Sequence, residues 1–334
     1  VYKRQVSSMG AVKTRHSLSR RRFLKTSGIA LAASSAFSPA DDDKGGTGTD
    51  SDREVIDIHQ HVNYVGRDNG ALIKHQQAMG IDKTVLLPAG AYLLRESTHE
   101  GRSAGLAARI FGTSAAARLA AKHPEQYVFF ANEVPDLPNA SKEIEKFLKA
   151  GAVGIGEQKF NLESDSKEML AVFDLAKDYD VPVLLHFQHG MYNHGLDRFH
   201  KVLEKYPSVN FIGHAQTWWG NIDKEHDQEV MYPKEKVTPG GITDRLLSDY
   251  PNMFGDLSAG SGQNALKRDR DHACEFLDRH QDKLMFGSDC ADRDGVGSSC
   301  TGAGTLKLLR DLVADDEALR KILSKNARRV IQRG

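Results

Sequence analysis

The chain has 334 residues, of which 45 are Lys or Arg and 45 are Asp or Glu, so its formal net charge is zero. The first 40 residues hold eight of the basic side chains and no acidic one, which leaves 37 basic against 45 acidic and a net charge of −8 beyond them. A surface of that charge argues against general binding to nucleic acid or to anionic membranes. No run approaches the roughly 20 apolar residues that span a bilayer, so we expect a soluble protein without a stable membrane anchor.

Residues 1–40 have the order of parts found in an export signal. Arg20 and Arg21 begin a basic group that ends in Phe-Leu-Lys, a short apolar stretch follows, and small residues at 38–40 offer a cleavage site. This order resembles a twin-arginine signal peptide, which implies the twin-arginine export machinery as a partner and a periplasmic or extracellular location. A basic disordered tail is the alternative. Residues 41–53 are polar and rich in glycine and predict a flexible linker.

Beyond the linker, apolar runs alternate with helical patterns. Residues 166–179, for example, repeat Met169, Phe173 and Ala176 on one face of a helix. Eight apolar runs are typical of buried strands, at residues 55–61, 84–88, 127–131, 152–160, 182–187, 209–214, 253–257 and 284–289. Strands that alternate with helices pair in parallel, and eight such units favour a closed (β/α)8 TIM barrel over a doubly wound sheet. We therefore predict a single α/β barrel domain over residues 54–334.

The clearest chemical motif closes the first predicted strand. Asp57-Ile58-His59-Gln60-His61 contains a His-x-His pair. Because residues two apart in a strand point to the same face, we expect Asp57, His59 and His61 to project together. Two imidazoles on one face can bind one transition-metal ion, but histidine is also a common polar residue. The pair alone therefore leaves a metal site and ordinary hydrogen-bonded histidines as alternatives.

A barrel of this kind places its catalytic groups at the carboxyl ends of its strands. The predicted fifth, sixth and eighth strands end in or near His186, His214 and Asp289, which join His59 and His61 at the same rim. Any one of these residues could simply cap a strand. All five at one rim are hard to explain in that way, so their distribution predicts a functional site.

With these motifs the chain resembles the amidohydrolase superfamily, and in particular the branch that contains the aminocarboxymuconate-semialdehyde decarboxylase-like enzymes. The resemblance covers residues 54–334 and includes an Asn-Ala ending at residues 326–327. It implies that the metal ligands are His59, His61, His186 and Asp289, with His214 as a catalytic histidine beside them. The motifs are specific for the superfamily and leave the substrate open.

The implied donor set suits zinc or another divalent transition ion, because three imidazoles and one carboxylate leave a position for water. The ion lowers the pKa of that water toward about 7, and Asp289 is expected to accept its proton and return it to the leaving group. His214 is expected to polarise a carbonyl or stabilise an oxyanion. We therefore expect an exported metal-dependent hydrolase that cleaves a C–N or C–O bond of a small amide, lactone or ester through a metal-bound hydroxide.

Two other functions stay open. The same ligands serve the non-oxidative decarboxylation of unsaturated or aromatic acids, and a barrel can also bind a metal and a ligand without turnover. The number of ions is open as well, because Glu157 and Lys159 share a face of the fourth predicted strand. Related barrels place a glutamate or a carboxylated lysine there to hold a second metal. A Glu–Lys ion pair, or a lysine that binds a substrate carboxylate, is the alternative, and we expect one ion per chain.

The connection after the sixth predicted strand, residues 216–241, is long for a barrel loop and holds the two tryptophans of the chain, Trp218 and Trp219. Aromatic rings there predict contact with a planar or ring-shaped substrate, and packing of the loop onto its neighbours is the alternative. His189, which follows the fifth strand, is a further candidate for substrate contact. Asp256 ends the seventh strand and is expected to support the site, to contact the substrate or to cap the strand.

The chain has three cysteines, which leave at least one thiol unpaired, and it has no Cys-x-x-Cys spacing that would indicate a structural zinc site. Cys290 and Cys300 flank the loop after the eighth predicted strand. Outside the cytoplasm these two thiols could oxidise to a disulfide. The spacing alone leaves the disulfide and two free thiols as alternatives.

Overall fold

The structure is a computed structural model that describes residues 54–88, 98–99, 103–104 and 110–331. The predicted export signal and linker lie outside the described residues. The described residues all belong to one compact unit, Gly48–Gly334. Among them, no helix has the length and apolar character needed to cross a membrane.

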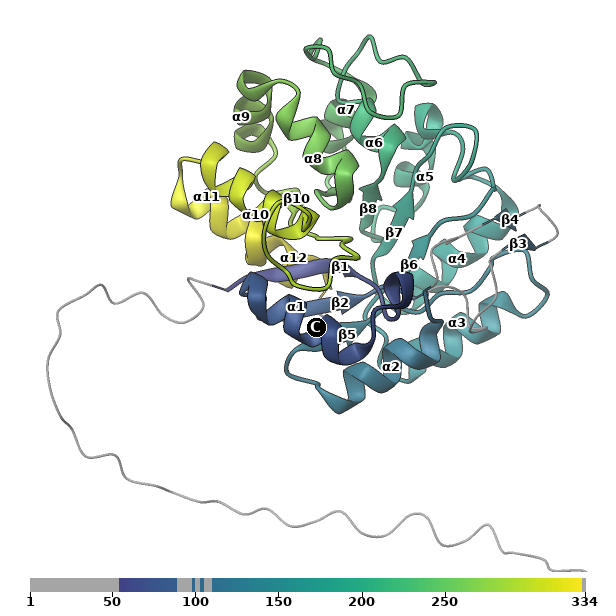
Figure 1. Cartoon of the computed structure of the whole chain (residues 1–334). Helices are drawn as coiled ribbons and strands as arrows, with labels where there is room; N and C mark the ends of the chain where they lie inside the picture. Colours follow the sequence, from purple (N-terminus) through teal and green to yellow (C-terminus); the bar gives the residue numbers. More distant parts are fainter. Residues whose placement is uncertain (1–53, 89–97, 100–102, 105–109, 332–334) are drawn as a thin grey trace, which may run out of the picture. The chain divides into compact units, whose positions relative to one another are not determined.

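Eight parallel strands stand at the centre of this unit (Figure 1). They are β1 (Ile56–Gln60), β2 (Lys83–Leu86), β5 (Tyr127–Phe129), β6 (Ile155–Gln158), β7 (Val183–His186), β8 (Phe211–His214), β9 (Met253–Asp256) and β10 (Leu284–Met285). Three pair in the order β1-β2-β5 and five in the order β10-β9-β8-β7-β6. A parallel bridge between Ala131 and Ile155 joins the sheets at one edge, and the 3.1 Å hydrogen bond from Ile58 N to Phe286 O joins them at the other. The predicted (β/α)8 barrel is therefore confirmed.

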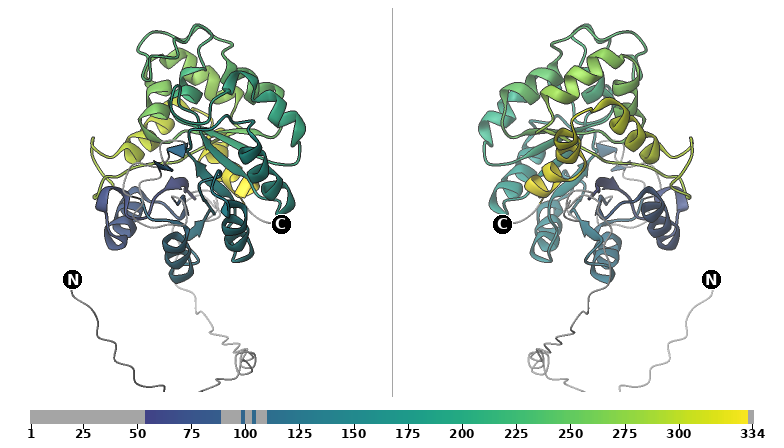
Figure 2. Two further views of the ribbon diagram at one scale, coloured as in Figure 1. Left: turned by 90° about the vertical axis from the view of Figure 1, so that its right-hand side faces the viewer. Right: turned by 90° about the vertical axis from the view of Figure 1, so that its left-hand side faces the viewer.

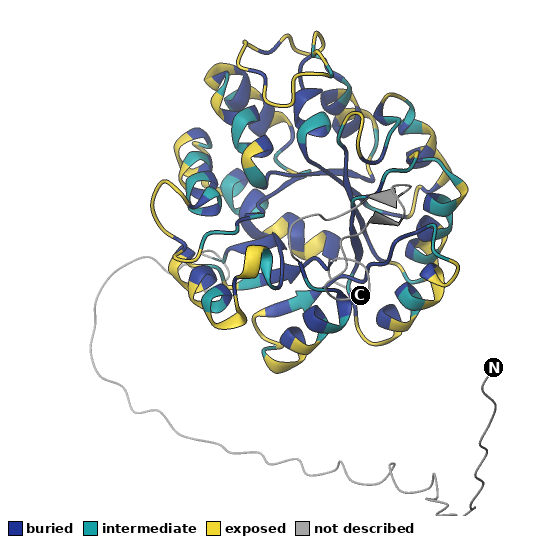
Figure 3. Cartoon of the chain, turned by 45° about the vertical axis from the view of Figure 1, so that its right-hand side comes forward, coloured by how far each residue is buried: buried dark blue, intermediate teal, exposed yellow. Residues whose placement is uncertain are grey.

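Helices cover the outside of the strands, as both side views in Figure 2 show. The predicted helix at 166–179 is α4 (Lys167–Asp178), which buries Met169, Phe173 and Ala176 and begins where the Ser166 hydroxyl accepts from Met169 N. Figure 3 shows the same division for the other helices, with buried residues toward the strands and exposed residues outward. The other α-helices are α1 (Asn69–Met79), α2 (Thr113–Lys122), α3 (Ala140–Lys149), α5 (His200–Lys205), α6 (Gln216–Gly220), α7 (Ile242–Asp249), α8 (Ala259–Lys267), α9 (Arg270–Arg279), α10 (Thr301–Leu312), α11 (Asp316–Arg320) and α12 (Asn326–Ile331). A short antiparallel pair, β3 (Thr98–His99) and β4 (Ser103–Ala104), follows β2.

The inside of the barrel has an apolar floor and a polar mouth, because side chains alternate along each strand. The floor consists of Ile56, Ile58, Val85, Leu87, Phe130, Leu184, Ile212, Phe254 and Met285, and α12 closes it with Ala327, Val330 and Ile331. On β7, His186 lies two residues beyond the floor residue Leu184. In the same way, His214 on β8 lies two residues beyond the floor residue Ile212, and Asp256 on β9 lies two residues beyond Phe254. The polar residues therefore emerge together at the carboxyl ends of the strands.

The last barrel strand is shorter than predicted. β10 ends at Met285 instead of continuing to Asp289, and beyond it the chain leaves the sheet. Asp289 adopts a positive φ of 40°, a left-handed conformation that interrupts an extended strand. Its N–H donates to His59 O at 2.8 Å. This turn places Asp289 beside the end of β1 rather than above its own strand.

Candidate metal centre at the barrel mouth

Six side chains that can bind a metal ion converge where the barrel strands end, and we call them the barrel-mouth site. They are His59 and His61 at β1, Glu157 on β6, His186 on β7, His214 on β8 and Asp289 after β10. Their ligand atoms form overlapping groups of three in which all atoms lie within 4.8 Å of one another. The structure thus brings together the five residues that the strand ends predicted and Glu157, the candidate ligand of a second metal.

Asp57 does not project with the two histidines, so the expectation of a regular strand is wrong at this position. The pairing of β1 with β2 shifts register between Asp57 and Gln60, and such an irregularity changes the side on which the next residues lie. The Asp57 carboxylate instead accepts hydrogen bonds from His59 N, Gln76 Nε2 and the N–H and hydroxyl of Ser288. Asp57 thereby holds the end of β1 in place and helps to position His59.

The two histidines of β1 turn their Nε2 atoms toward each other. His61 Nδ1 lies 2.7 Å from Leu87 O, an oxygen that can only accept, so His61 carries its proton on Nδ1. His59 Nδ1 lies 2.6 Å from Asp256 Oδ2, which favours the same tautomer. The two Nε2 atoms are 3.2 Å apart, and two neutral rings would face each other there with lone pairs. A cation removes this repulsion, and a far ring nitrogen held by a carboxylate or a carbonyl is typical of metal-bound histidine.

Two carboxylates complete this set of donor atoms. Asp289 Oδ1 lies 3.2 Å from His61 Nε2 and 3.8 Å from His59 Nε2, while Glu157 Oε2 lies 3.7 and 3.6 Å from the same two atoms. Donor atoms about 2.1 Å from one ion lie about 3.0–3.5 Å from one another, so the separations of each carboxylate oxygen from the two Nε2 atoms are within a few tenths of an ångström of that spacing. Asp289 Oδ1 is also buried without a hydrogen-bond partner. The donor set therefore fits one divalent transition ion.

The remaining two histidines lie on the other side of Glu157. His186 Nδ1 is 2.5 Å from Glu157 Oε1, and its Nε2 is 3.0 Å from Gln188 Oε1. His214 Nε2 lies 3.9 Å from Glu157 Oε1 and 3.7 Å from Asp289 Oδ2. The structure groups His186 with Glu157 and His214. That His186 shares one ligand set with the two histidines of β1 stays a prediction.

Burial and charge together shift the pKa values in the site. Burial opposes the charge on His59, but the Asp289 and Asp256 carboxylates outweigh it and raise the pKa of His59 well above its ordinary value. Burial raises the pKa of the Asp256 and Asp289 carboxyl groups, but the positive charge of His59 and the neighbouring histidines outweighs that effect and lowers the pKa of both groups. Burial, followed by the Lys159 ammonium, lowers the pKa of His186 to about 4. His186 is therefore neutral at pH 7 and able to donate a lone pair.

Asp256 supports two histidines of the site, which is one of the roles expected for it. Its Oδ2 contacts Nδ1 of His59 at 2.6 Å and Nδ1 of His214 at 3.3 Å. Ser258 donates to the same carboxylate through its N–H and its hydroxyl, and its Oγ lies 3.0 Å from His214 Nδ1. Ser258 was not identified from the sequence, because a serine two residues beyond a strand belongs to no motif.

Tyr64 is a second side chain that the sequence did not mark. Its ring meets the ring of His61 edge to face, with centroids 4.9 Å apart. The Asp289 carboxylate, together with burial, raises the pKa of the phenol, which therefore remains protonated. Tyr64 is thus a hydrogen-bond donor beside the barrel-mouth site.

The two tryptophans are buried, so the structure does not offer their rings to a substrate as the sequence led us to expect. Trp218 is 0 % exposed and Trp219 is 2 % exposed. Trp218 stacks on Phe187 with ring centroids 6.2 Å apart, and Trp219 donates from Nε1 to Asp256 O at 2.9 Å. Both lie in α6, which turns them into the hydrophobic core. The alternative, packing of the loop onto its neighbours, is confirmed.

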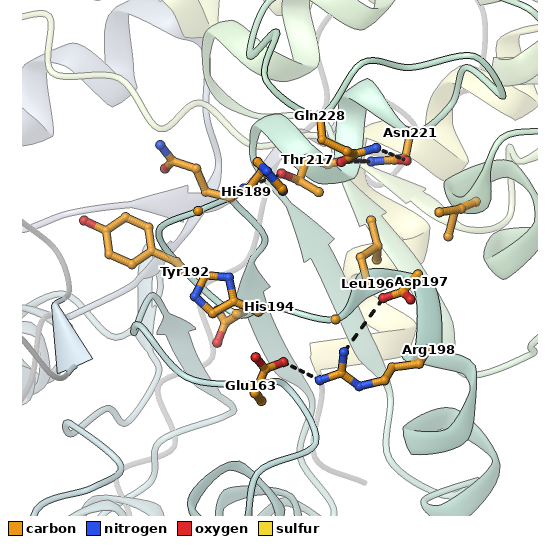
Figure 4. A pocket seen from close by; sticks show the side chains of 15 residues that line it. Glu163, His189, Tyr192, His194, Leu196, Asp197, Arg198, Thr217, Asn221 and Gln228 are labelled. Atoms are coloured by element: carbon orange, nitrogen blue, oxygen red, sulfur yellow. Dashed lines mark hydrogen bonds and ion pairs between the residues drawn. The ribbon is translucent and has the colours of Figure 1, made fainter.

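A cavity of about 490 Å³ is lined by Tyr192, His189 and His194 (Figure 4). Gln188 and Tyr192 line it and both contact His186, Gln188 through its amide oxygen and Tyr192 through rings 5.6 Å apart. His189 lies in the wall, and its half-exposed ring places Nε2 3.2 Å from Glu229 Oε1. Contact between His189 and a substrate stays a prediction.

Lys159 does not form the ion pair with Glu157 that was one alternative for it. Its Nζ lies 5.5 Å from the centroid of the Tyr192 ring, and no carboxylate of the described residues lies within 4.0 Å of it. Its charge still contributes to the low pKa values of Glu157 and His186. Lys159 therefore faces the boundary between the barrel-mouth site and the cavity.

Comparison with known proteins gives a family and a fold. The model of a family described as Amidohydrolase matches residues 56–333. No curated protein gives a significant match. Among solved structures, the chain is similar to an uncharacterised TIM-barrel protein from Bordetella bronchiseptica, with a TM-score of 0.55 and 15% identity over 83% of this chain and 98% of that one.

Two further solved structures have named activities. A probable 2-pyrone-4,6-dicarboxylic acid hydrolase from Acinetobacter baumannii, with citric acid bound, gives a TM-score of 0.54 and 14% identity over 83% of this chain and 99% of that one. A 2,6-dihydroxybenzoate decarboxylase from Rhizobium gives a TM-score of 0.51 and 15% identity over 83% of this chain and 98% of that one. At such identities the similarity shows the fold, which these two proteins use for different reactions.

Proposed function

The chain belongs to the amidohydrolase family, and from this premise we propose that it is a metal-dependent hydrolase. The proposed reaction is cleavage of a C–N or C–O bond in a small amide, lactone or ester. The observation that carries the proposal is the convergence of His59 Nε2, His61 Nε2 and the unpartnered Asp289 Oδ1 on one point. A divalent ion held there, zinc by its preference for imidazole and carboxylate, would polarise a carbonyl and lower the pKa of a water toward about 7.

Asp289 is the residue that we propose to move the proton of the attacking water. With Oδ1 holding the ion, the second carboxylate oxygen, Oδ2, would accept that proton and then return it to the leaving nitrogen or oxygen. His214 faces the same space, with Nε2 3.7 Å from Asp289 Oδ2. When Nε2 carries a proton, it donates to the carbonyl oxygen as negative charge develops there.

The substrate contacts that we propose lie between Lys159 and the cavity. An ammonium group without a carboxylate partner attracts an anion, and Lys159 lies above the Tyr192 ring at the edge of the barrel-mouth site. The Tyr192 ring, although only 5% exposed, lines the cavity, and His189 adds a polar group on the wall. These features favour a small cyclic or aromatic substrate that carries a carboxylate.

Metal analysis of the purified chain tests the centre. We expect one divalent ion that is lost in both His59→Ala and Asp289→Ala, because each variant removes a donor atom from the convergence point. His200→Ala in α5, away from the strand ends, is the matched control and should keep the ion. Full metal content in both site variants would refute the assignment. Loss of a second ion in Glu157→Ala would indicate a binuclear centre instead of the mononuclear one.

The reaction type requires a separate assay. A panel of cyclic amides, lactones and aromatic acids should give a single ring-opened acid from a lactone or a cyclic amide, with a net proton released from the lactone, and no carbon dioxide. Release of carbon dioxide from an aromatic or unsaturated acid would indicate that the enzyme is a decarboxylase and not a hydrolase. Tight binding without any product would indicate a binding protein. The fold does not distinguish these outcomes, because hydrolases and decarboxylases both occur among the similar structures.

We also propose that the enzyme is exported through the twin-arginine pathway, on the order of parts in residues 1–40. Replacing Arg20 and Arg21 with Lys preserves the charge and removes the paired guanidinium groups. The expected result is precursor that stays in the cytoplasm of an expressing cell. Periplasmic accumulation equal to that of the unmodified chain would contradict this route.

A further inference from the structure

A second group of potential metal ligands lies apart from the barrel-mouth donors, where α1 meets the segment between β10 and α10 (Figure 1). It consists of His75, Cys290 and Cys300, which we call the thiol cluster. Cys300 Sγ lies 3.6 Å from Cys290 Sγ and 3.4 Å from His75 Nε2. All three residues are buried, and both cysteines are free thiols. The proposed hydrolysis does not use them.

The hydrogen bonds around His75 turn its lone pair toward the two sulfurs. Gln76 Nε2 donates to Asp57 Oδ2 at 2.9 Å and to Thr84 Oγ1 at 2.8 Å, so its amide oxygen is left to face His75. His75 Nδ1 lies 2.9 Å from that oxygen and must therefore donate to it. The unprotonated Nε2 then points at Cys300. This is the arrangement expected of a metal-binding imidazole, whose far nitrogen donates to an oxygen.

The spacing of the donor atoms is that of ligands around one ion. Bonds of about 2.3 Å to sulfur and about 2.0–2.1 Å to nitrogen, in a tetrahedral arrangement, separate two sulfurs by about 3.8 Å and a sulfur and a nitrogen by about 3.6 Å. The observed separations of 3.6 and 3.4 Å are within about 0.2 Å of these values. The thioether of Met79 lies 3.7 Å from Cys300 Sγ and offers a fourth soft donor.

The backbone at the start of α10 is adapted to this cluster. Ala303 N donates to Cys300 Sγ at 3.3 Å, a contact that stabilises negative charge on the sulfur. Position 302 must be glycine, because a Cβ there would lie 2.7 Å from Met79 Sδ and 2.7 Å from Ser288 Cβ. The helix can therefore approach α1 closely enough to bring Cys300 to His75.

We propose that His75, Cys290 and Cys300 form a second metal site, which binds a thiophilic d10 cation, Zn²⁺ or Cu⁺, with the Met79 thioether as an added donor. Two thiolates, an imidazole and a thioether are soft donors that select such ions, whereas the barrel-mouth site offers only nitrogen and oxygen. Binding displaces the two thiol protons to solvent and leaves the oxidation state of both sulfurs unchanged. The ion links α1 to the segment that carries Asp289, so it stabilises the wall of the barrel mouth without taking part in the reaction.

Cobalt absorption tests this proposal, because thiolate bound to Co²⁺ gives a charge-transfer band in the near ultraviolet that imidazole and carboxylate ligands do not give. Co²⁺ is added to the full metal-free chain, kept reduced by a reductant without thiols. We expect the band to saturate at no more than two equivalents, because the barrel-mouth site also takes up an ion, and to be lost in Cys290→Ser and in Cys300→Ser. Cys274→Ser in α9, the third cysteine, is the matched control and should keep it. Displacement of the band by Zn²⁺ alone or by Cu⁺ alone then separates the two cations.

A measurement on the unmodified chain covers the case in which a serine variant does not fold. Bound Zn²⁺ or Cu⁺ should protect Cys290 and Cys300 from alkylation, as followed by peptide mass spectrometry, and leave Cys274 reactive. His59→Ala should keep this protection, which separates the thiol cluster from the barrel-mouth site. The proposal is overturned if no cation gives protection or absorption, or if the band survives in both serine variants. A Cys290–Cys300 disulfide in the purified chain, with no cation uptake after reduction, would overturn it as well.

Discussion

Asp256→Asn should weaken metal binding at the barrel mouth without removing a ligand. In the native chain the Asp256 carboxylate lies 2.6 Å from His59 Nδ1 and 3.3 Å from His214 Nδ1. It accepts only, so it holds the His59 proton on Nδ1 and leaves Nε2 facing His61. Asparagine has nearly the same shape, but Ser258 N and Oγ already donate to this group. The asparagine amide can turn its NH2 group toward Ser258, and then it loses a hydrogen bond from Ser258. It can instead turn the NH2 group toward His59 Nδ1, and then the His59 proton moves to Nε2.

The size of the effect follows from the role of Asp256 as the partner of a ligand. Loss of such a partner typically costs 10–100-fold in metal affinity, which is about 1.4–2.7 kcal/mol. Because two histidines share this carboxylate, we expect the upper end of that range. The dissociation constant of Zn²⁺, measured by competition with a chelator, should rise accordingly, and kcat/KM should fall when the ion is limiting.

Asp244→Asn is a control of the same chemistry. Asp244 Oδ1 lies 2.6 Å from His280 Nε2, and the same carboxylate binds Arg279, so the chain contains a second buried Asp–His contact away from the barrel mouth. This control should lower the melting temperature and leave Zn²⁺ affinity unchanged. If Asp256→Asn bound Zn²⁺ as tightly as the unmodified chain, His59 would not be oriented by Asp256 and the proposed centre would fail.

Three further outcomes follow from the same contacts. His214→Asn should keep the metal ion and lower kcat by about 100-fold or more, since it removes a group proposed to act on the carbonyl; metal loss would make His214 a ligand. Trp219→Phe should destabilise the fold by about 1–3 kcal/mol in a denaturant titration, because Asp256 O loses its indole donor, while an unchanged KM would agree with the burial of the ring. For His186, burial and then Lys159 lower the pKa to about 4, below the unfolded value of about 6.5. The metal-free folded state thus binds fewer protons than the unfolded state between these pH values, so its free energy of unfolding should fall as pH decreases from about 6.5 to 4. His186→Asn should flatten that dependence, and an equal slope in both proteins would contradict the shift.

The sequence determined the fold and the position of the site at the carboxyl ends of the strands, because both follow from local periodicity. Apolar runs that alternate with helical patterns specify parallel strands with helices between them, and eight repeats close a barrel. Within a strand, two-residue alternation places His186 above Leu184 without any information about distant contacts. The convergence of the histidines at one rim was therefore predictable from their positions after the strands.

Some features were decided only by the tertiary structure, among them the orientation of Asp57 and the burial of Trp218. The side on which Asp57 lies depends on a register shift that arises when β1 pairs with β2. The burial of Trp218 depends on where α6 docks, and an aromatic ring in a long loop has the same sequence pattern whether it faces the core or a substrate.

The contact between His75 and Cys300 joins residues 225 positions apart. The free energy of such a contact depends on which surfaces the whole fold brings together, and local sequence carries no information about that. The same reason explains why Ser258 and Tyr64 had no motif to mark them. The local sequence specifies the type of each ligand and its position on a strand. Packing between distant segments determines which partners orient each ligand.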